Sequence, residues 1–459
     1  MLVQGDQRMP RDSDSAWEKI LSPSAKALIR TIRVMEEGSV VELFQPGPEL
    51  DRLQQMLASH KGSFYHALRS RIDEVAKRGG VDLITQQDAW TLIEEVWGRN
   101  VSCFSKTELS VLEGVLENPG TGLRELAKNI DLSYSQARRA MQRIRSAGVI
   151  KIEGLHNLQK LGLQRVLLIL ESPKLVLSSP YVTRSLYIDG SESLVFLVIT
   201  FPANRTDELL NLVRSLRSTS HRVTAWRLSK GRSKFSGMYS SEKKCWNLDL
   251  FHWKLQLRKD ESQITVSYSS PDTNDRTHFT AADLKILDHL VNDFDAKASE
   301  IVEATGLSES TAFRRRATLI EENAVVPRAR VRIPILTDRV LVSSDPECAS
   351  NLLSAWTLLP LTYLTQIKNL ETGERRVLQL AAIPPGMGSG LVRTLNSAMS
   401  RVDDYSAYTI SAGTVGHVKT SSLFNRREKT WKRGDFFDAR SYEIVRREAE
   451  IGEIPLDLA

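Results

Sequence analysis

The stretch Leu132-Ser133-Tyr134-Ser135-Gln136-Ala137-Arg138-Arg139-Ala140-Met141-Gln142-Arg143-Ile144-Arg145-Ser146-Ala147-Gly148-Val149 predicts one amphipathic helix. Ser133 or Ser135 can cap its start, because a hydroxyl accepts a hydrogen bond from an unpaired backbone N–H. Gly148 suits the left-handed residue that often ends a helix. Between these ends, apolar residues recur at helical spacing and form one stripe. They are Ala137, Met141 and Ile144.

The remaining surface of this helix carries long polar side chains. Residues 133–148 contain four arginines and no acidic residue. A cationic helix face suits the major groove of DNA, where guanidinium groups match guanine edges and phosphates. A solvated basic helix on an ordinary globular domain is the alternative.

The same layout occurs again 175 positions later. Leu109 corresponds to Leu284, Glu125 to Glu300 and Ser135 to Ser310. Two helices, a short turn and a third helix are therefore expected twice, in 105–149 and 280–326. This arrangement resembles the winged helix-turn-helix of the Lrp/AsnC transcription regulators. The segment 307–316, LSESTAFRRR, carries the resemblance best.

Length and composition favour a multidomain protein. The 459 residues are 41% hydrophobic and 26% charged, with a net charge of +6, and predict three or four domains. The three cysteines are scattered, so neither a disulfide framework nor a zinc site is expected. No run of about eighteen apolar residues and no signal peptide is found, which indicates a cytoplasmic protein without membrane contact.

Strand-like and helical segments alternate after each basic helix as β, α, β, β, α, β, the order of a ferredoxin-like plait. The predicted fold class is therefore α+β, with tandem winged helix-turn-helix domains, each followed by such a plait, and an N-terminal helical domain. That helical domain is either a pairing module or a third, degenerate winged helix. An extension ending in Trp, Asp and Phe follows each plait and predicts a packing arm. The expected boundaries are a disordered tail at 1–22, the helical domain at 23–99, winged helices at 100–164 and 278–337, plaits with extensions at 165–257 and 338–437, a linker at 258–277 and a C-terminal tail at 438–459.

The DNA-contacting residues are expected on the two third helices and on the wings that follow. Gln136, Arg139 and Gln142 would read bases, whereas Lys151, Lys160 and Arg165 would hold phosphates. In the second copy the helix has three arginines against three glutamates, and Arg328, Arg330 and Arg332 would form a cationic wing. The full predicted set is Ser133, Ser135, Gln136, Arg138, Arg139, Gln142, Arg143, Lys151, Ser308, Ser310, Thr311, Arg314, Arg315, Arg328 and Arg330.

No catalytic constellation emerges from the sequence. The eight histidines do not stand at metal-ligand spacing, and His156 is expected to be solvated. We therefore expect no enzyme, no metal and no cofactor, and a sequence-specific DNA-binding transcription regulator as the function. The resemblance implies double-stranded DNA as partner, plaits that pair sheet against sheet within the chain as a pseudo-dimer, and a small-molecule effector where the plaits meet, near Gly190 and Gly373. Further homo-oligomers stay open.

Two alternatives remain at this point. Siroheme decarboxylases resemble the same winged-helix-plus-plait family, and such an enzyme would need His and Arg over the sheet. His221 and Arg222 begin a strand, whereas His417 lies past the last strand of the second copy. The other alternative is an interaction protein that binds no DNA.

Overall fold

The computed structural model describes residues 19–38, 47–78, 83–173, 179–188, 193–218, 220, 222–235, 238–257, 279–346, 349–399, 405–425, 427–428 and 430–432. It is a mixed α+β protein, as the sequence predicts. The chain forms two compact units. Unit 1 combines the residues up to Phe104 with 141–149 and 333–335, and unit 2 contains the remainder. None of the described helices is both long and apolar enough to cross a membrane.

Unit 1 is helical. It contains α2 (Pro23–Glu36), α3 (Pro48–Ser59), α4 (Phe64–Arg78) and α5 (Gln86–Val101), joined by the last turns of α8 (Tyr134–Ser146). Its core is aliphatic and aromatic, with Ile32, Phe64 and Ile93 fully buried. Ile84 forms a single parallel bridge with Leu21.

The sequence repeat is also a structural repeat. Helices α6 (Lys106–Glu117), α7 (Leu123–Asn129) and α8 return as α11 (Ala281–Asn292), α12 (Ala298–Thr305) and α13 (Glu309–Glu321). α11 and α13 begin and end 175 positions after α6 and α8. Both first helices start with a capping box, Ser105 with Glu108 and Thr280 with Asp283.

The strands that follow α8 and α13 pair with each other. β1 (Ile150–His156) and β9 (Val325–Val331) form a two-stranded antiparallel ribbon in which Glu153 stands opposite Arg328. We call this pair of strands the ribbon. A winged helix would instead pair such a strand within its own domain. The two expected wings are thus merged into one element.

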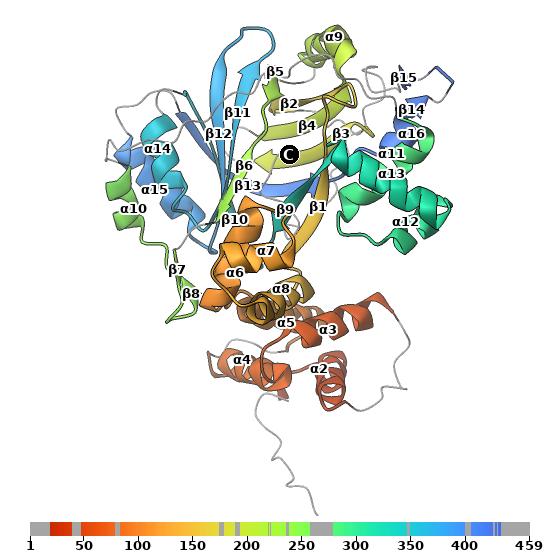
Figure 1. Ribbon diagram of the computed structural model, residues 1–459. Helices are drawn as coiled ribbons and strands as arrows, with labels where there is room; N and C mark the ends of the chain where they lie inside the picture. Colours follow the sequence, from red (N-terminus) through yellow and green to blue (C-terminus); the bar gives the residue numbers. More distant parts are fainter. Residues whose placement is uncertain are drawn as a thin grey trace, which may run out of the picture. The chain divides into compact units, whose positions relative to one another are not determined.

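A closed sheet forms the centre of unit 2 (Figure 1). We call the part of unit 2 before residues 258–277 the first half and the part after them the second half. The first half supplies β3-β4-β2-β5, and the second half supplies β11-β12-β10-β13. β5 pairs with β11 and β13 pairs with β3, so eight strands close on themselves. The strands are β2 (Leu163–Glu171), β3 (Val182–Ile188), β4 (Leu194–Pro202), β5 (Arg222–Leu228), β10 (Asp338–Ser344), β11 (Leu361–Asn369), β12 (Arg375–Ile383) and β13 (Tyr405–Val415).

Closure occurs edge to edge, whereas the sequence led us to expect two sheets packed face to face. An additional strand, β6 (Arg232–Phe235), pairs with β11 outside the closed ring. Closing the ring leaves none of its eight strands with an open edge. Each half keeps a separate core. One lies under α9 (Thr206–Leu216), and the other lies under α14 (Ala349–Trp356) and α15 (Gly388–Ala398).

The aromatic extensions are exchanged between the halves. β7 (Tyr239–Ser240), β8 (Cys245–Trp246) and α10 (Leu250–Gln256) come from the first half, yet Trp253 packs into the second core. Its indole Nε1 donates to the Ala355 carbonyl at 2.7 Å. Figure 1 shows α10 beside α14 and α15.

The second extension does the converse. It contains α16 (Thr420–Leu423), β14 (Phe424–Asn425) and β15 (Thr430–Trp431). Trp431 packs against the first core, and its Nε1 donates to the Leu161 carbonyl at 2.8 Å. Each extension is thus a packing arm, and each covers the other half of the chain.

Candidate functional site

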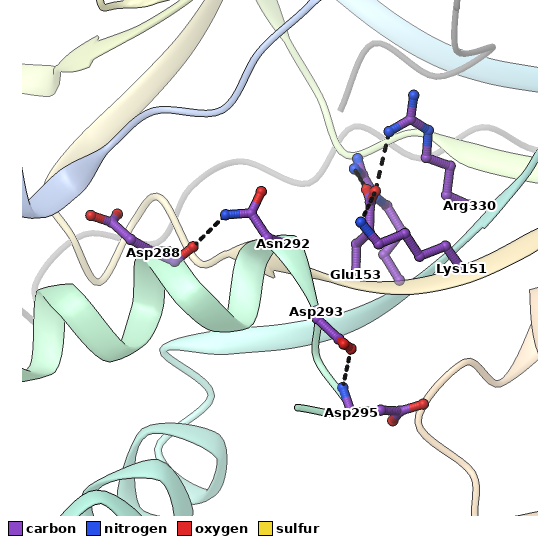
Figure 2. A network of polar contacts seen from close by, with 8 residues as sticks. Lys151, Glu153, Asp288, Asn292, Asp293, Asp295 and Arg330 are labelled. Atoms are coloured by element: carbon purple, nitrogen blue, oxygen red, sulfur yellow. Dashed lines mark hydrogen bonds and ion pairs between the residues drawn. The ribbon is translucent and has the colours of Figure 1, made fainter. Parts of the chain in front are cut away.

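The ribbon places a buried carboxylate among arginines. Glu153 is 1% exposed, and its oxygens accept from Arg328 Nη2 at 3.0 Å and Arg330 Nη1 at 3.1 Å. The Lys151 Nζ atom lies 3.8 Å from Glu153 Oε1. Figure 2 shows the Lys151 and Arg330 side chains converging on the Glu153 carboxylate. The strand register brings these side chains together. Glu153 is paired with Arg328, and Lys151 is paired with Arg330, two residues along on the same face of the ribbon.

The arginines keep this carboxylate ionised. Burial by itself raises the pKa of Glu153, but the charges of Arg330 and Arg328 and their hydrogen bonds outweigh it. The pKa of Glu153 is therefore below its ordinary value. A charged Glu153 is the form that both guanidinium groups require.

Two histidines belong to the same electrostatic cluster. His156 ends β1 and is buried, and burial, with the charges of Arg165 and His417, lowers its pKa to about 3. His417 follows β13. Burial lowers the pKa of His417, the Glu153 charge opposes this, and Arg328, Arg184 and Arg330 add to the lowering. Both imidazoles are therefore neutral at pH 7.

We call this set the histidine–arginine cluster. It comprises Glu153, His156, Arg165, Arg184, Arg328, Arg330 and His417, all within unit 2.

The charges that act on the two imidazoles of the cluster are mostly positive. The charged groups that act on its two imidazoles are four arginines and one carboxylate. Arg184, on β3, is only 4% exposed. The buried His156 Nε2 atom has no hydrogen-bond partner among the described residues. The cluster therefore has the capacity to bind an anionic ligand with further polar or metal-binding groups.

The chemistry of the cluster limits what that ligand is. Guanidinium groups bind carboxylates and phosphates in paired hydrogen bonds. A neutral imidazole is the form that ligates a metal. In the described part of the chain, no group of three or more His, Cys, Asp or Glu could hold a metal ion.

Most of the predicted DNA-contacting residues on α8 are exposed. Arg138, Arg139 and Gln142 are exposed, whereas Ala137 and Ile144 are buried as the helical stripe requires. Gln136 is occupied, because its side chain accepts from the backbone N–H and hydroxyl of Ser133 at the start of the helix. The Ser133 hydroxyl also contacts that of Ser135.

Arg143 on the same helix is less available than its neighbours. It is only partly exposed, and its Nη2 donates to the Asn100 carbonyl at 3.3 Å, inside unit 1. These placements leave Arg138, Arg139 and Gln142 as the strongest part of the predicted basic surface. Their role in DNA binding stays a prediction.

The arginines of the second repeat are engaged within the protein. Arg315 bonds to Thr280 and Asp283 at 2.8 and 2.7 Å, and Arg316 donates to the Phe294 carbonyl at 3.2 Å. Arg314 is exposed. The hydroxyls of Ser308, Ser310 and Thr311 form hydrogen bonds with one another at the start of α13. The basic surface of α13 is thus reduced to a single arginine.

The predicted phosphate contacts of the wings are also committed elsewhere. Arg328 and Arg330 hold Glu153, and the Lys160 Nζ atom donates to the Glu322 carbonyl. Arg165 belongs to the histidine–arginine cluster. Lys151 is 57% exposed and 3.8 Å from the Glu153 carboxylate.

Four members of this cluster were either not predicted as site residues from the sequence or were expected in a different environment. His156 was expected in solvent and is buried. His417 was noted only for lying beyond the last strand, and Glu153 and Arg184 were not singled out. His221 and Gly190, named for the enzyme and effector alternatives, lie outside the described residues. The available signal was the repeat itself, which puts Glu153 in one copy where Arg328 stands in the other.

Comparisons with known proteins found similarity in structure only. No family model matches the chain, and no curated protein matches it. Two solved structures of the siroheme decarboxylase NirDL are similar, and one of them is a complex with an iron-uroporphyrin III analogue. That complex is 11% identical, with a TM-score of 0.38, covering 68% of this chain and 94% of its own. The other is 11% identical, with a TM-score of 0.39, covering 69% and 96%.

The expectation that this chain is not an enzyme is withdrawn as wrong, because the similar solved structures are those of an enzyme. Likeness at this level says nothing about a substrate. The chemistry of the site has to be argued from the residues of this chain.

Proposed function

We propose that unit 2 binds a polycarboxylate ligand at the histidine–arginine cluster and acts on it as an enzyme. The observation that carries this proposal is the gathering of four arginines and one carboxylate around two neutral, buried or half-buried imidazoles. A ligand with several carboxylates would suit these guanidinium groups, because the two groups form paired hydrogen bonds. A metal carried by the ligand would suit the imidazoles, because the described residues offer too few ligands to hold a metal ion alone.

An iron tetrapyrrole with carboxylate side chains combines both properties. This favours the siroheme-decarboxylase-like alternative over a protein that only binds DNA. In that reaction a C–C bond to a carboxylate breaks, carbon dioxide leaves, and the remaining carbon takes a proton. Arg184 would hold a carboxylate of the ligand, and so would Arg330 through the guanidinium N–H groups that do not donate to Glu153. His417, the less buried imidazole, would face it, and the iron would supply the site for a nitrogen ligand.

For each half, the architecture that we propose is a helix-turn-helix module followed by a ferredoxin-like plait. The strand order β13-β10-β12-β11, with α14 and α15 as crossovers, supports this for the second half. The first half has the matching order β5-β2-β4-β3, with α9 as its second crossover. On this view the pairing of the halves within one chain is a built-in pseudo-dimer.

Titration of the full chain with iron-uroporphyrin III, followed by absorbance, tests the binding site. Arg330→Gln removes one charge from the cluster and should weaken binding at least about tenfold, since a hydrogen bond to a charged group contributes about 1.5–3 kcal/mol. Arg332→Gln is the matched control, because Arg332 is exposed two residues further along. Equal affinity of both variants and wild type, or no saturable binding, would contradict the proposal. Loss of 44 mass units per carboxylate (about that of carbon dioxide) would identify the reaction.

We also propose double-stranded DNA as a partner of α8. The observation that favours it is the exposed set Arg138, Arg139 and Gln142 on one helix without an acidic residue. A gel-shift titration with Arg139→Ala should show weaker binding and a smaller salt dependence than wild type. Arg316→Ala, which changes the same charge on α13 where the arginine is bonded internally, is the control for nonspecific charge effects. Unchanged affinity for Arg139→Ala would remove α8 as the reader.

A further inference from the structure

The ribbon contains the pseudo-two-fold axis that relates the two halves of unit 2. β1 spans 150–156 and β9 spans 325–331, which is the same segment shifted by the repeat of 175 residues. In the antiparallel register Glu153 stands opposite Arg328. These two residues are also equivalent in the repeat. The axis therefore passes between position 153 and its own counterpart.

When two identical halves pair about such an axis, a residue on the axis lies opposite the same residue of the other half. Two first halves, from two chains, would place Glu153 opposite Glu153 in the same register. Two second halves would place Arg328 opposite Arg328, with Arg330 of each strand nearby. Like charges directly opposite each other on paired strands are destabilising, and burial increases the penalty because little water screens them. Only the pairing of a first half with a second half brings glutamate and arginine together.

We infer that Glu153 and Arg328 form a charge lock that selects pairing of unlike halves and rejects pairing of like halves. This selectivity arises because the same repeat position is acidic in the first copy and basic in the second. Glu153 is nearly inaccessible to solvent, and the Arg328 side chain is 14% exposed, so the lock acts where charge is poorly screened.

Two other kinds of contact between the halves lack this selectivity. The seams β5–β11 and β13–β3 are equivalent under the same axis, and so are the two exchanged arms. In the arms, Tyr239 packs edge-on against Trp246 with 5.1 Å between ring centroids. Phe424 packs against Trp431 in the same way with 5.3 Å between ring centroids, so the two arms are built alike. Backbone hydrogen bonds and aromatic packing of this kind would also form between like halves of two chains. The ribbon thus adds a selection against those assemblies that the seams and the arms do not provide.

The lock matters because both halves are present in every molecule. Pairing of like halves between chains leaves the remaining halves free to recruit further chains, which produces open-ended assemblies. The covalent connection favours pairing within the chain by raising the local concentration. The charge lock adds a preference that does not depend on protein concentration.

Charge reversal in the full-length protein tests the inference. Glu153→Arg and Arg328→Glu each create a like-charged pair on the axis, and each should reduce the folding equilibrium constant roughly 100-fold or more, as for other broken buried ion pairs. The double variant E153R/R328E restores a glutamate opposite an arginine and should recover at least half of the lost shift in the urea midpoint. Arg332→Glu applies the same charge change at an exposed position and should leave the midpoint close to wild type.

A second variant measures selectivity without a charge clash. Glu153→Met together with Arg328→Met removes the charges from the axis while preserving side chains of similar length. After dilution from urea at increasing protein concentration, wild type should give one species by light scattering. E153M/R328M should give a growing fraction of larger assemblies, because like halves are no longer rejected. The inference is overturned if the reversed double variant is no more stable than the single variants, or if E153M/R328M assembles as wild type does.

Discussion

Acid sensitivity of the histidine–arginine cluster gives a prediction whose size follows from the structure. The pKa of His156 is about 3 in the folded chain, compared with 6.5 for an ordinary histidine. Between those values the unfolded chain binds a proton that the folded chain refuses. Stability is therefore fully present above pH 6.5 and is lost as the pH falls toward 3. One proton accounts for about 1.4 kcal/mol per pH unit, so lowering the pH from 7 to 5 should cost about 2 kcal/mol through His156 alone.

The assay is urea unfolding of the full chain at pH 7 and pH 5, followed by tryptophan fluorescence, for wild type and His156→Leu. Leucine fills a similar volume and cannot be protonated. The variant should lose about 2 kcal/mol less than wild type over this interval. His417 has a lowered pKa as well and remains in both proteins, so the difference between them reports His156. His66→Gln, at an exposed position of unit 1, is the control. Identical pH dependence of wild type and His156→Leu would refute the reasoning.

The remaining predictions concern packing in unit 2 and are measured by thermal or urea unfolding. Gly154→Ala should destabilise the ribbon by about 1–3 kcal/mol, because the added Cβ would lie 2.6 Å from the Leu290 carbonyl oxygen. Gly122→Ala, with nothing within 4 Å of its Cβ, should stay within about 0.5 kcal/mol of wild type. Trp253→Ala should cost about 3–5 kcal/mol, because it empties a fully buried site in the core of the opposite half. Phe251→Ala, at a position 73% exposed on the same helix, should change stability little.

Local sequence patterns predicted the helices well. The third helix of each repeat was placed from its capping residues and apolar spacing, and α8 and α13 occupy those segments. Such signals act within a few turns of chain, where side-chain caps and helical periodicity decide the structure. In the second half the alternation of the two periodicities likewise predicted the order β10-α14-β11-β12-α15-β13.

Long-range pairing was beyond those patterns. Nothing local to β1 indicates that its partner is β9 and not a neighbouring strand, since both are short and alternate polar with apolar residues. Once the strands pair, Arg328 and Arg330 turn from an expected phosphate-binding surface into the partners of Glu153. His156 likewise belongs to the site only in the folded chain, where Arg165 of β2 and His417 after β13 act on it. The site residues come from segments more than two hundred positions apart, so only tertiary structure brings them together.

The histidine–arginine cluster as the ligand site is tested most directly by hydrogen–deuterium exchange of the full chain with and without iron-uroporphyrin III. Bound ligand should slow exchange in three segments, at 150–156, 325–331 and 405–418, because these contribute Glu153, His156, both ribbon arginines and His417. Exchange across α2–α5 in unit 1 should be unchanged. Saturating ligand that protects none of the three segments, or that protects only α8 and α13, would contradict the account.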